Sequence, residues 1–143
     1  MKRLLLKKLK NAFIISQRQR KFTFLVFWLS IYRNLLLVVK SKKAFTEHIL
    51  QNQKVNAVST PEKIAVAKDI ALAIHIVNKH LLWKNVCRHQ SWQAVFLLLK
   101  YQIPFEYFVG IDKTKNIKEG HSWVKVNGKF ICGRCNEKNY FII

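Results

Sequence analysis

The sequence predicts an α+β domain in which helices precede a small antiparallel sheet. Two segments with helical apolar spacing come first, at 59–81 and from Cys87 onward. Short segments rich in aromatic and β-branched residues follow them, as expected for strands. Asn127-Gly128 lies between two of these segments and is the strongest short signal for a β-hairpin.

Positive charge is concentrated at the start of the chain. The 143 residues include 26 Lys and Arg against 7 Asp and Glu, a formal net charge of +19. Twelve of the basic residues and no acidic residue lie within 1–46. We therefore divide the chain into a basic, apolar helical region at 1–58 and a core domain at 59–143. Such a charge calls for an acidic partner: nucleic acid, an anionic membrane surface or a complementary protein.

Other features of the composition exclude several classes of protein and make one class of partner unexpected. Half of the residues are apolar, which excludes a disordered chain, and three cysteines cannot form a fully paired disulfide framework. We expect a cytoplasmic protein without a cofactor. Nucleic acid is not the expected partner, because the aromatic residues lie mainly in apolar runs. Zinc-finger spacing, an RNP-like strand and a phosphate-binding glycine loop are all missing from the sequence.

The most hydrophobic segment, 22–39, has the length of a short membrane span. Arg33 lies inside it, and an arginine near the centre of a membrane helix costs about 2.5–3.5 kcal/mol. Basic residues flank both ends, so neither orientation across a bilayer is favoured. We predict a helix that packs against the domain or a partner. Attachment of residues 1–46 to a membrane surface is the alternative.

Two helices and several strands are predicted in the core. Ser59 and Glu62 match a capping box, and Pro61 suits the first turn of a helix that extends to about Leu81. Its predicted apolar face consists of Val66, Ile70, Ala73, Ile74 and Val77. The second helix begins at or just before Cys87, and Pro104 stops it. Strands are predicted at 105–111, 121–126 and 129–132, with 140–143 pairing at an edge.

Cys87 and His121 are the candidate catalytic residues. Cys87 lies at a predicted helix N-terminus, where unpaired N–H groups favour a thiolate and can hold an oxyanion. His121 begins a strand that should pack against this helix, so its imidazole could serve as general base and then general acid. Trp123, on the same face of the strand, would shield the pair from water. Taken singly, each residue has a plainer interpretation, as a buried apolar cysteine and a surface histidine.

Several short motifs between Trp83 and Gly128 occur in one order. They are Cys87 at a helix start, Ile103-Pro104, Val109-Gly110-Ile111, His121-Ser122-Trp123-Val124 and Asn127-Gly128. This order resembles the transglutaminase-like core of the lasso-peptide leader peptidases, in their stand-alone form without a fused leader-recognition domain. The resemblance implies a cysteine protease that removes the leader from a ribosomally made precursor peptide. It also implies two partners, a small leader-recognition protein and a macrolactam synthetase.

One position departs from that family pattern. The family's third catalytic residue, an Asp, falls about twelve positions after the His, which here is Gly133. A triad needs an acceptor that fixes the imidazole tautomer. Asn127, Asn136, Glu137 or a backbone carbonyl could supply it; a Cys–His dyad or lost activity are the other possibilities.

Cys132 and Cys135 form a C-x-x-C motif near the end of the chain. We expect two free thiols, with half of a zinc site as the less favoured interpretation, because no second pair of ligands is present. The sequence therefore predicts a leader peptidase that uses Cys87 and His121. The alternative is a non-enzymatic basic adaptor that binds a membrane surface or an acidic protein.

Overall fold

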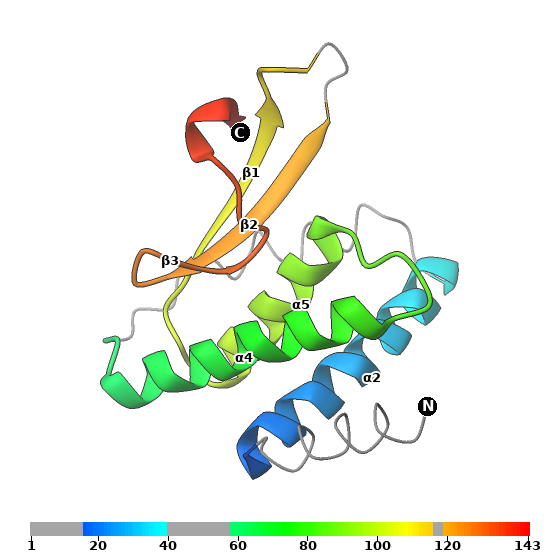
Figure 1. Ribbon diagram of the computed structural model, residues 1–143, viewed down its shortest axis with the longest axis vertical. Coiled ribbons are helices and arrows are strands. Elements are labelled where there is room, and N and C mark those ends of the chain that lie inside the picture. Colours follow the sequence, from blue (N-terminus) through cyan, green and yellow to red (C-terminus); the bar gives the residue numbers. More distant parts are fainter. Residues whose placement is uncertain (1–15, 40–57, 116–118) are drawn as a thin grey trace, which may run out of the picture.

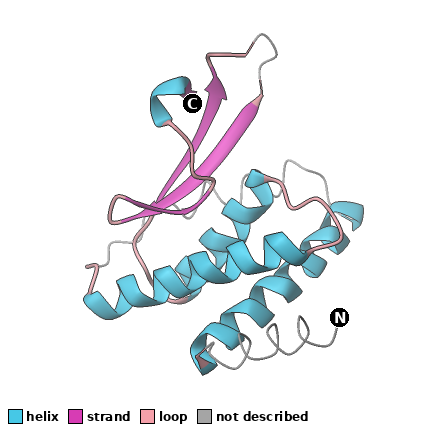
Figure 2. Ribbon diagram, in the orientation of Figure 1, coloured by secondary structure: helices cyan, strands magenta, loops and turns pink. Residues whose placement is uncertain are grey.

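The computed structural model describes residues 16–39, 58–115 and 119–143. Within these residues, three helices lie on one side of a four-stranded antiparallel sheet (Figures 1 and 2). The predicted α+β class is confirmed. Much of the predicted basic region, at 1–15 and 40–57, lies outside the described residues.

Helix α2 (Gln17–Val39) packs one face against the domain. Phe22 and Val26 are buried on this face, and Ser30 and Arg33 continue the same stripe. The indole Nε1 of Trp83 donates a hydrogen bond to Ser30 Oγ at 2.9 Å. The prediction of a helix packed on the domain is thus confirmed. Among the described helices, none has the length and apolar character needed to cross a membrane.

Helix α4 (Pro61–His80) begins one residue later than the predicted capping box requires. Thr60, not Ser59, is the N-cap, and its Oγ accepts from the backbone N–H of Lys63 at 3.3 Å. A residue before proline is driven into extended backbone, so Thr60 with φ −91° and ψ 157° cannot be helical. The buried face consists of Ala67, Ile70, Ala73, Ile74 and Val77.

Helix α5 (Cys87–Lys100) starts at Cys87, as predicted. It ends before Pro104 because Gln102 adopts a left-handed backbone, with φ 52°. The N–H of Ile103 then donates to Leu98 O at 2.9 Å and that of Gln102 to Leu99 O at 3.0 Å, a Schellman ending. In Figure 1, α4 and α5 lie between α2 and the sheet.

The sheet has the strand order β3-β2-β1-β4. Its strands are β1 (Glu106–Asp112), β2 (Gly120–Val126), β3 (Lys129–Cys132) and β4 (Tyr140–Ile142). Asn127 and Gly128, with φ 49° and 72°, form the predicted two-residue hairpin between β2 and β3. The C-terminal strand β4 pairs with β1, so the predicted edge pairing is also confirmed.

The two faces of β2 meet different surroundings. Val124 and Val126 are part of the core shared with the helices, and Ser122 Oγ lies 3.1 Å from Ser91 Oγ of α5. His121 and Trp123 face the other way, where the C-terminal segment covers them. His121 thus lies at the rim of the sheet, next to the start of α5.

Candidate active site

Cys87 occupies the first turn of α5 and is half-buried. The carbonyl of the N-cap residue Val86 accepts from the N–H groups of His89 at 2.8 Å and Gln90 at 3.1 Å. Helix α5 has no acidic residue in its first turn, so the positive end of the helix dipole is not offset there. This setting can hold the negative charge of an oxyanion beside the Cys87 sulfur.

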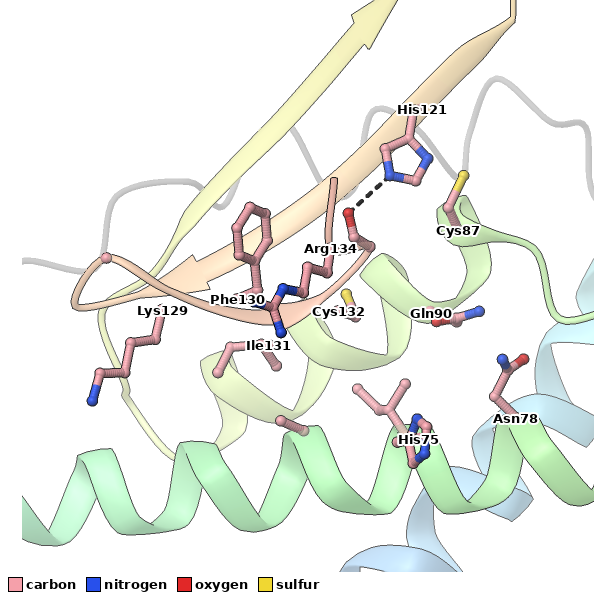
Figure 3. A pocket seen from close by; sticks show the side chains of 14 residues that line it. His75, Asn78, Cys87, Gln90, His121, Lys129, Phe130, Ile131, Cys132 and Arg134 are labelled. Carbon is pink, nitrogen blue, oxygen red and sulfur yellow. Dashed lines mark hydrogen bonds between the residues drawn. The ribbon is translucent and has the colours of Figure 1, made fainter. Parts of the chain in front are cut away.

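The tautomer of His121 follows from one hydrogen bond. His121 Nε2 lies 2.8 Å from the carbonyl oxygen of Gly133. Because a carbonyl can only accept, Nε2 carries the hydrogen and Nδ1 carries the lone pair. Figure 3 shows Nδ1 on the side of the ring that faces Cys87. The geometry therefore presents a proton acceptor toward the thiol.

Aromatic contacts hold the imidazole plane of His121. Trp123 stacks on it with ring centroids 5.9 Å apart, and Tyr140 lies 5.4 Å away. Trp123 is fully buried, and its Nε1 donates to Glu137 Oε1 at 2.9 Å. Lys125 pairs with the same carboxylate at 2.9 Å. Trp123 and His121 lie on the same face of β2, as predicted, and Glu137 binds the indole.

A cleft of about 690 Å³ joins the two candidate catalytic residues. Cys87 and His121 lie at one end of it, as Figure 3 shows. One wall comes from α4, where Ala71, Ile74, His75 and Asn78 repeat at helical spacing. The other wall comes from β3 and the residues on either side of it, 128–134. A cleft of this size can hold several residues of a peptide.

The two C-x-x-C thiols are free and differ in surroundings. Burial raises the pKa of Cys132 to about 12, and its Sγ lies 3.7 Å from Ser91 Oγ. Burial, and then the charge of Glu137, raises the pKa of the half-buried Cys135. Within 16–39, 58–115 and 119–143, no group of three His, Cys, Asp or Glu side chains is placed to hold a metal ion.

Comparison with known protein families shows to which family the chain belongs. The model of the transglutaminase-like superfamily matches residues 30–143, which include Cys87, His121 and every described strand. The chain belongs to the transglutaminase-like superfamily. That superfamily includes cysteine peptidases and transglutaminases, and cysteine-protease activity is frequent in it. No curated protein and no solved structure matches the chain.

The acceptor for the imidazole of His121 is the backbone carbonyl of Gly133, the position at which the leader-peptidase pattern has an Asp. The backbone of Gly133 has φ +67°, which disfavours any other residue, and a Cβ there would lie 2.2 Å from Ser122 O. A side chain at this position is thus sterically excluded. The same close approach brings the Gly133 carbonyl to His121.

The other three candidate acceptors are engaged elsewhere. Asn127 forms the hairpin turn, at the opposite end of β2 from His121. Asn136 Oδ1 accepts from the N–H of Lys138 at 3.4 Å, capping the short helix Glu137–Asn139. Glu137 binds Trp123 and Lys125. Of the alternatives left open by the sequence, the backbone carbonyl is the one that the geometry matches, although no residue-type pattern could have singled it out.

Proposed function

We propose that the protein is a cysteine peptidase that cleaves the leader from a ribosomally made precursor peptide of the lasso class. The observation that carries the proposal is that Cys87 and His121 line the same end of a single cleft, with the lone-pair side of His121 turned toward Cys87. Membership of the transglutaminase-like superfamily supports the thiol chemistry. The order of motifs from Cys87 to Asn127-Gly128 supports the choice of substrate.

The first half of the reaction forms an acyl-enzyme. His121 Nδ1 takes the proton of Cys87 Sγ, and the thiolate attacks the carbonyl carbon of the scissile bond. N–H groups at the start of α5 hold the oxyanion of the tetrahedral intermediate. The C–N bond then breaks as His121 Nδ1 returns its proton to the leaving amine, which leaves a thioester on Cys87.

The second half releases the leader. His121 Nδ1 takes a proton from water, which attacks the thioester, and the Cys87 thiolate leaves; Nδ1 then returns this proton to the Cys87 sulfur, which restores the starting state. Throughout both halves, the bond from His121 Nε2–H to the Gly133 carbonyl keeps the ring in one orientation. The neutral carbonyl supports the imidazolium less strongly than a carboxylate would.

Two partners complete the proposal. A small leader-recognition protein would deliver the precursor, and a macrolactam synthetase would use the amine that cleavage exposes. Both follow from the resemblance to the leader peptidases. The protein would therefore act before ring closure.

Mass spectrometry of a candidate precursor, incubated with the purified protein and the recognition protein, tests this function. We expect a single cut in the wild type and a loss of about a thousandfold or more in rate for Cys87→Ala. Cys135→Ala is the matched control, since it removes an accessible thiol outside the catalytic pair, and it should cleave normally. Cleavage by Cys87→Ala at the wild-type rate, or an intact precursor in every reaction, would refute the proposal.

The outer face of α2 favours a second candidate function, a basic adaptor on an anionic membrane or an acidic protein. Large apolar side chains remain exposed there, namely Phe24, Phe27, Trp28, Tyr32 and Leu35. Arg20 and Phe24 also line an apolar cavity of about 410 Å³ between α2 and α4. Aromatic side chains next to basic ones suit a membrane interface. Co-sedimentation with phosphatidylserine vesicles, but not phosphatidylcholine vesicles, would support this function, and Cys87→Ala should not alter it.

A further inference from the structure

The cleft that contains Cys87 and His121 carries positive charge along its length. Its lining includes two cationic side chains on the β3 side, Arg134 and Lys129. None of the described residues that line it is acidic. Figure 3 shows Lys129 at the end of the cleft away from Cys87, with Arg134 between them.

Among the described residues, no carboxylate pairs with Arg134 or Lys129. The ion pairs within the described residues join Arg18 to Asp69, Lys115 to Glu119 and Lys125 to Glu137. In that part of the chain neither Arg134 nor Lys129 has a carboxylate partner. Both side chains are exposed to solvent. A ligand carboxylate could therefore bind them without first breaking an ion pair with the described residues.

The position of Arg134 is tied to the catalytic geometry. It directly follows Gly133, whose carbonyl binds His121 and whose close contact with β2 fixes the backbone. The backbone from which the Arg134 side chain extends is therefore held in place beside the imidazole of His121. A planar guanidinium binds a carboxylate through two parallel hydrogen bonds, which gives selectivity as well as affinity.

We infer that the cleft selects peptides with an acidic side chain close to the scissile bond, with Arg134 as the specificity-determining residue and Lys129 as a second, more distant cation. This inference rests on the proposed peptidase function, because the scissile bond is defined by Cys87. Apolar residues such as Ile74 and Phe130 line the rest of the cleft and would accept the substrate's aliphatic side chains.

Paired peptides test the inference. Each pair carries Asp or Asn at one position within three residues of the cleaved bond, in an otherwise constant precursor sequence. We expect one position at which Asp raises kcat/KM about fivefold or more over Asn, a preference that weakens from 50 to 500 mM NaCl. Arg134→Glu should reverse this preference, and Arg134→Lys, which keeps the charge but loses the paired hydrogen bonds of the guanidinium, should keep only part of it.

Two further variants control for a change in net charge and for misfolding of the Arg134→Glu protein. Lys21→Glu changes the net charge as much as Arg134→Glu does, but Lys21 is an exposed residue of α2 and does not line the cleft, so the preference should be unchanged. Lys129→Glu should reduce the preference for an acidic residue farther from the cut, which keeps the test valid if Arg134→Glu fails to fold. Equal kcat/KM for every Asp and Asn pair would overturn the inference.

Binding to the inactive protein separates this inference from the proposed function. The same peptide pairs, labelled with fluorescein, are titrated with Cys87→Ala protein and followed by anisotropy. Tighter binding of the Asp peptides, lost in Cys87→Ala/Arg134→Glu, supports an acid-selective cleft even if no peptide is cleaved by the wild type. Equal binding of both peptides overturns the inference, and cleavage without preference does so while leaving the peptidase function intact.

Discussion

The carbonyl oxygen of Gly133 lies 2.8 Å from Nε2 of His121 and takes the place of the acidic side chain expected at that position. The exchange is forced by packing, because Gly133 lies so close to Ser122 that no side chain fits. The tautomer of His121 is thereby set by the main chain. Because the acceptor is a main-chain carbonyl, no substitution deletes it. A substitution that displaces the main chain at Gly133 can still move the carbonyl away from His121.

Gly133→Ala tests this dependence. The added Cβ would meet Ser122 O at 2.2 Å and would sit on a backbone with φ +67°. We expect a loss of about 2 kcal/mol or more in the free energy of unfolding, together with a lower kcat as the carbonyl shifts. Gly120→Ala is the control, since a Cβ at Gly120 meets nothing within 4 Å. Urea unfolding that shows equal stability for both variants would contradict the prediction.

Alkylation should distinguish the three cysteines. Burial raises the pKa of Cys132 to about 12, and the pKa of Cys135 is raised by burial and by Glu137. Both are therefore thiols at pH 7.5, whereas iodoacetamide reacts with thiolates. We expect native protein to be labelled first at Cys87, at least about tenfold faster than at Cys132. Peptide mapping after a short pulse measures the order, and preferential labelling of Cys132 would contradict it.

His89 should make the protein sensitive to acid. Burial, reinforced by the charges of Arg33 and Arg88, lowers the pKa of His89 to about 4. In the unfolded chain, His89 binds a proton below about pH 6.5. Between pH 6.5 and 4 the unfolded state therefore holds more protons than the folded state, and the free energy of unfolding decreases as the pH is lowered. We expect His89→Gln to flatten the fall in Tm over this range. His80→Gln, at the exposed end of α4, should track the wild type; parallel curves for all three proteins would exclude the effect.

Glu137 should stabilise the C-terminal segment only above acidic pH. Hydrogen bonds from Lys125 and then Trp123 hold the pKa of Glu137 below its usual range. A depressed carboxyl pKa contributes stability that is present above the unfolded pKa and lost as pH falls through the folded one. The Tm of Glu137→Gln should thus lie below that of the wild type at pH 7, and the gap should close toward pH 3. Calorimetry at the two pH values measures it; a constant gap would contradict the prediction.

Substitution of Leu98 tests the hydrophobic core that supports the candidate active site. Leu98 is fully buried in α5, and its truncation to Ala should lower the free energy of unfolding by about 2–5 kcal/mol. Leu82 is 97% exposed, and Leu82→Ala should stay within about 0.5 kcal/mol of the wild type. Chemical denaturation of the two variants gives the comparison. A similar loss at both positions would contradict the assigned core.

Local signals explain why most of the elements could be predicted. The Asn127-Gly128 turn needs positive φ at two adjacent residues, and few other pairs tolerate it. Helix α5 starts at Cys87 and ends before Pro104, as its pattern predicts. The helix start at 59–62 was wrong by one residue, because the constraint of Pro61 on Thr60 outweighs the capping-box match of Ser59.

By itself, the sequence determined the α+β class, the order of the elements, and the two residue types able to perform thiol chemistry; the catalytic roles of Cys87 and His121 stay predictions. Periodicity and turn chemistry act over a few residues, so they can be read directly from the chain. Only the tertiary structure decided that the Gly133 carbonyl binds His121 and that Arg134 and Lys129 share the cleft with Cys87. A carbonyl is present at every residue, and its partner is chosen by packing between segments far apart in the chain, which leaves no mark in the residue types.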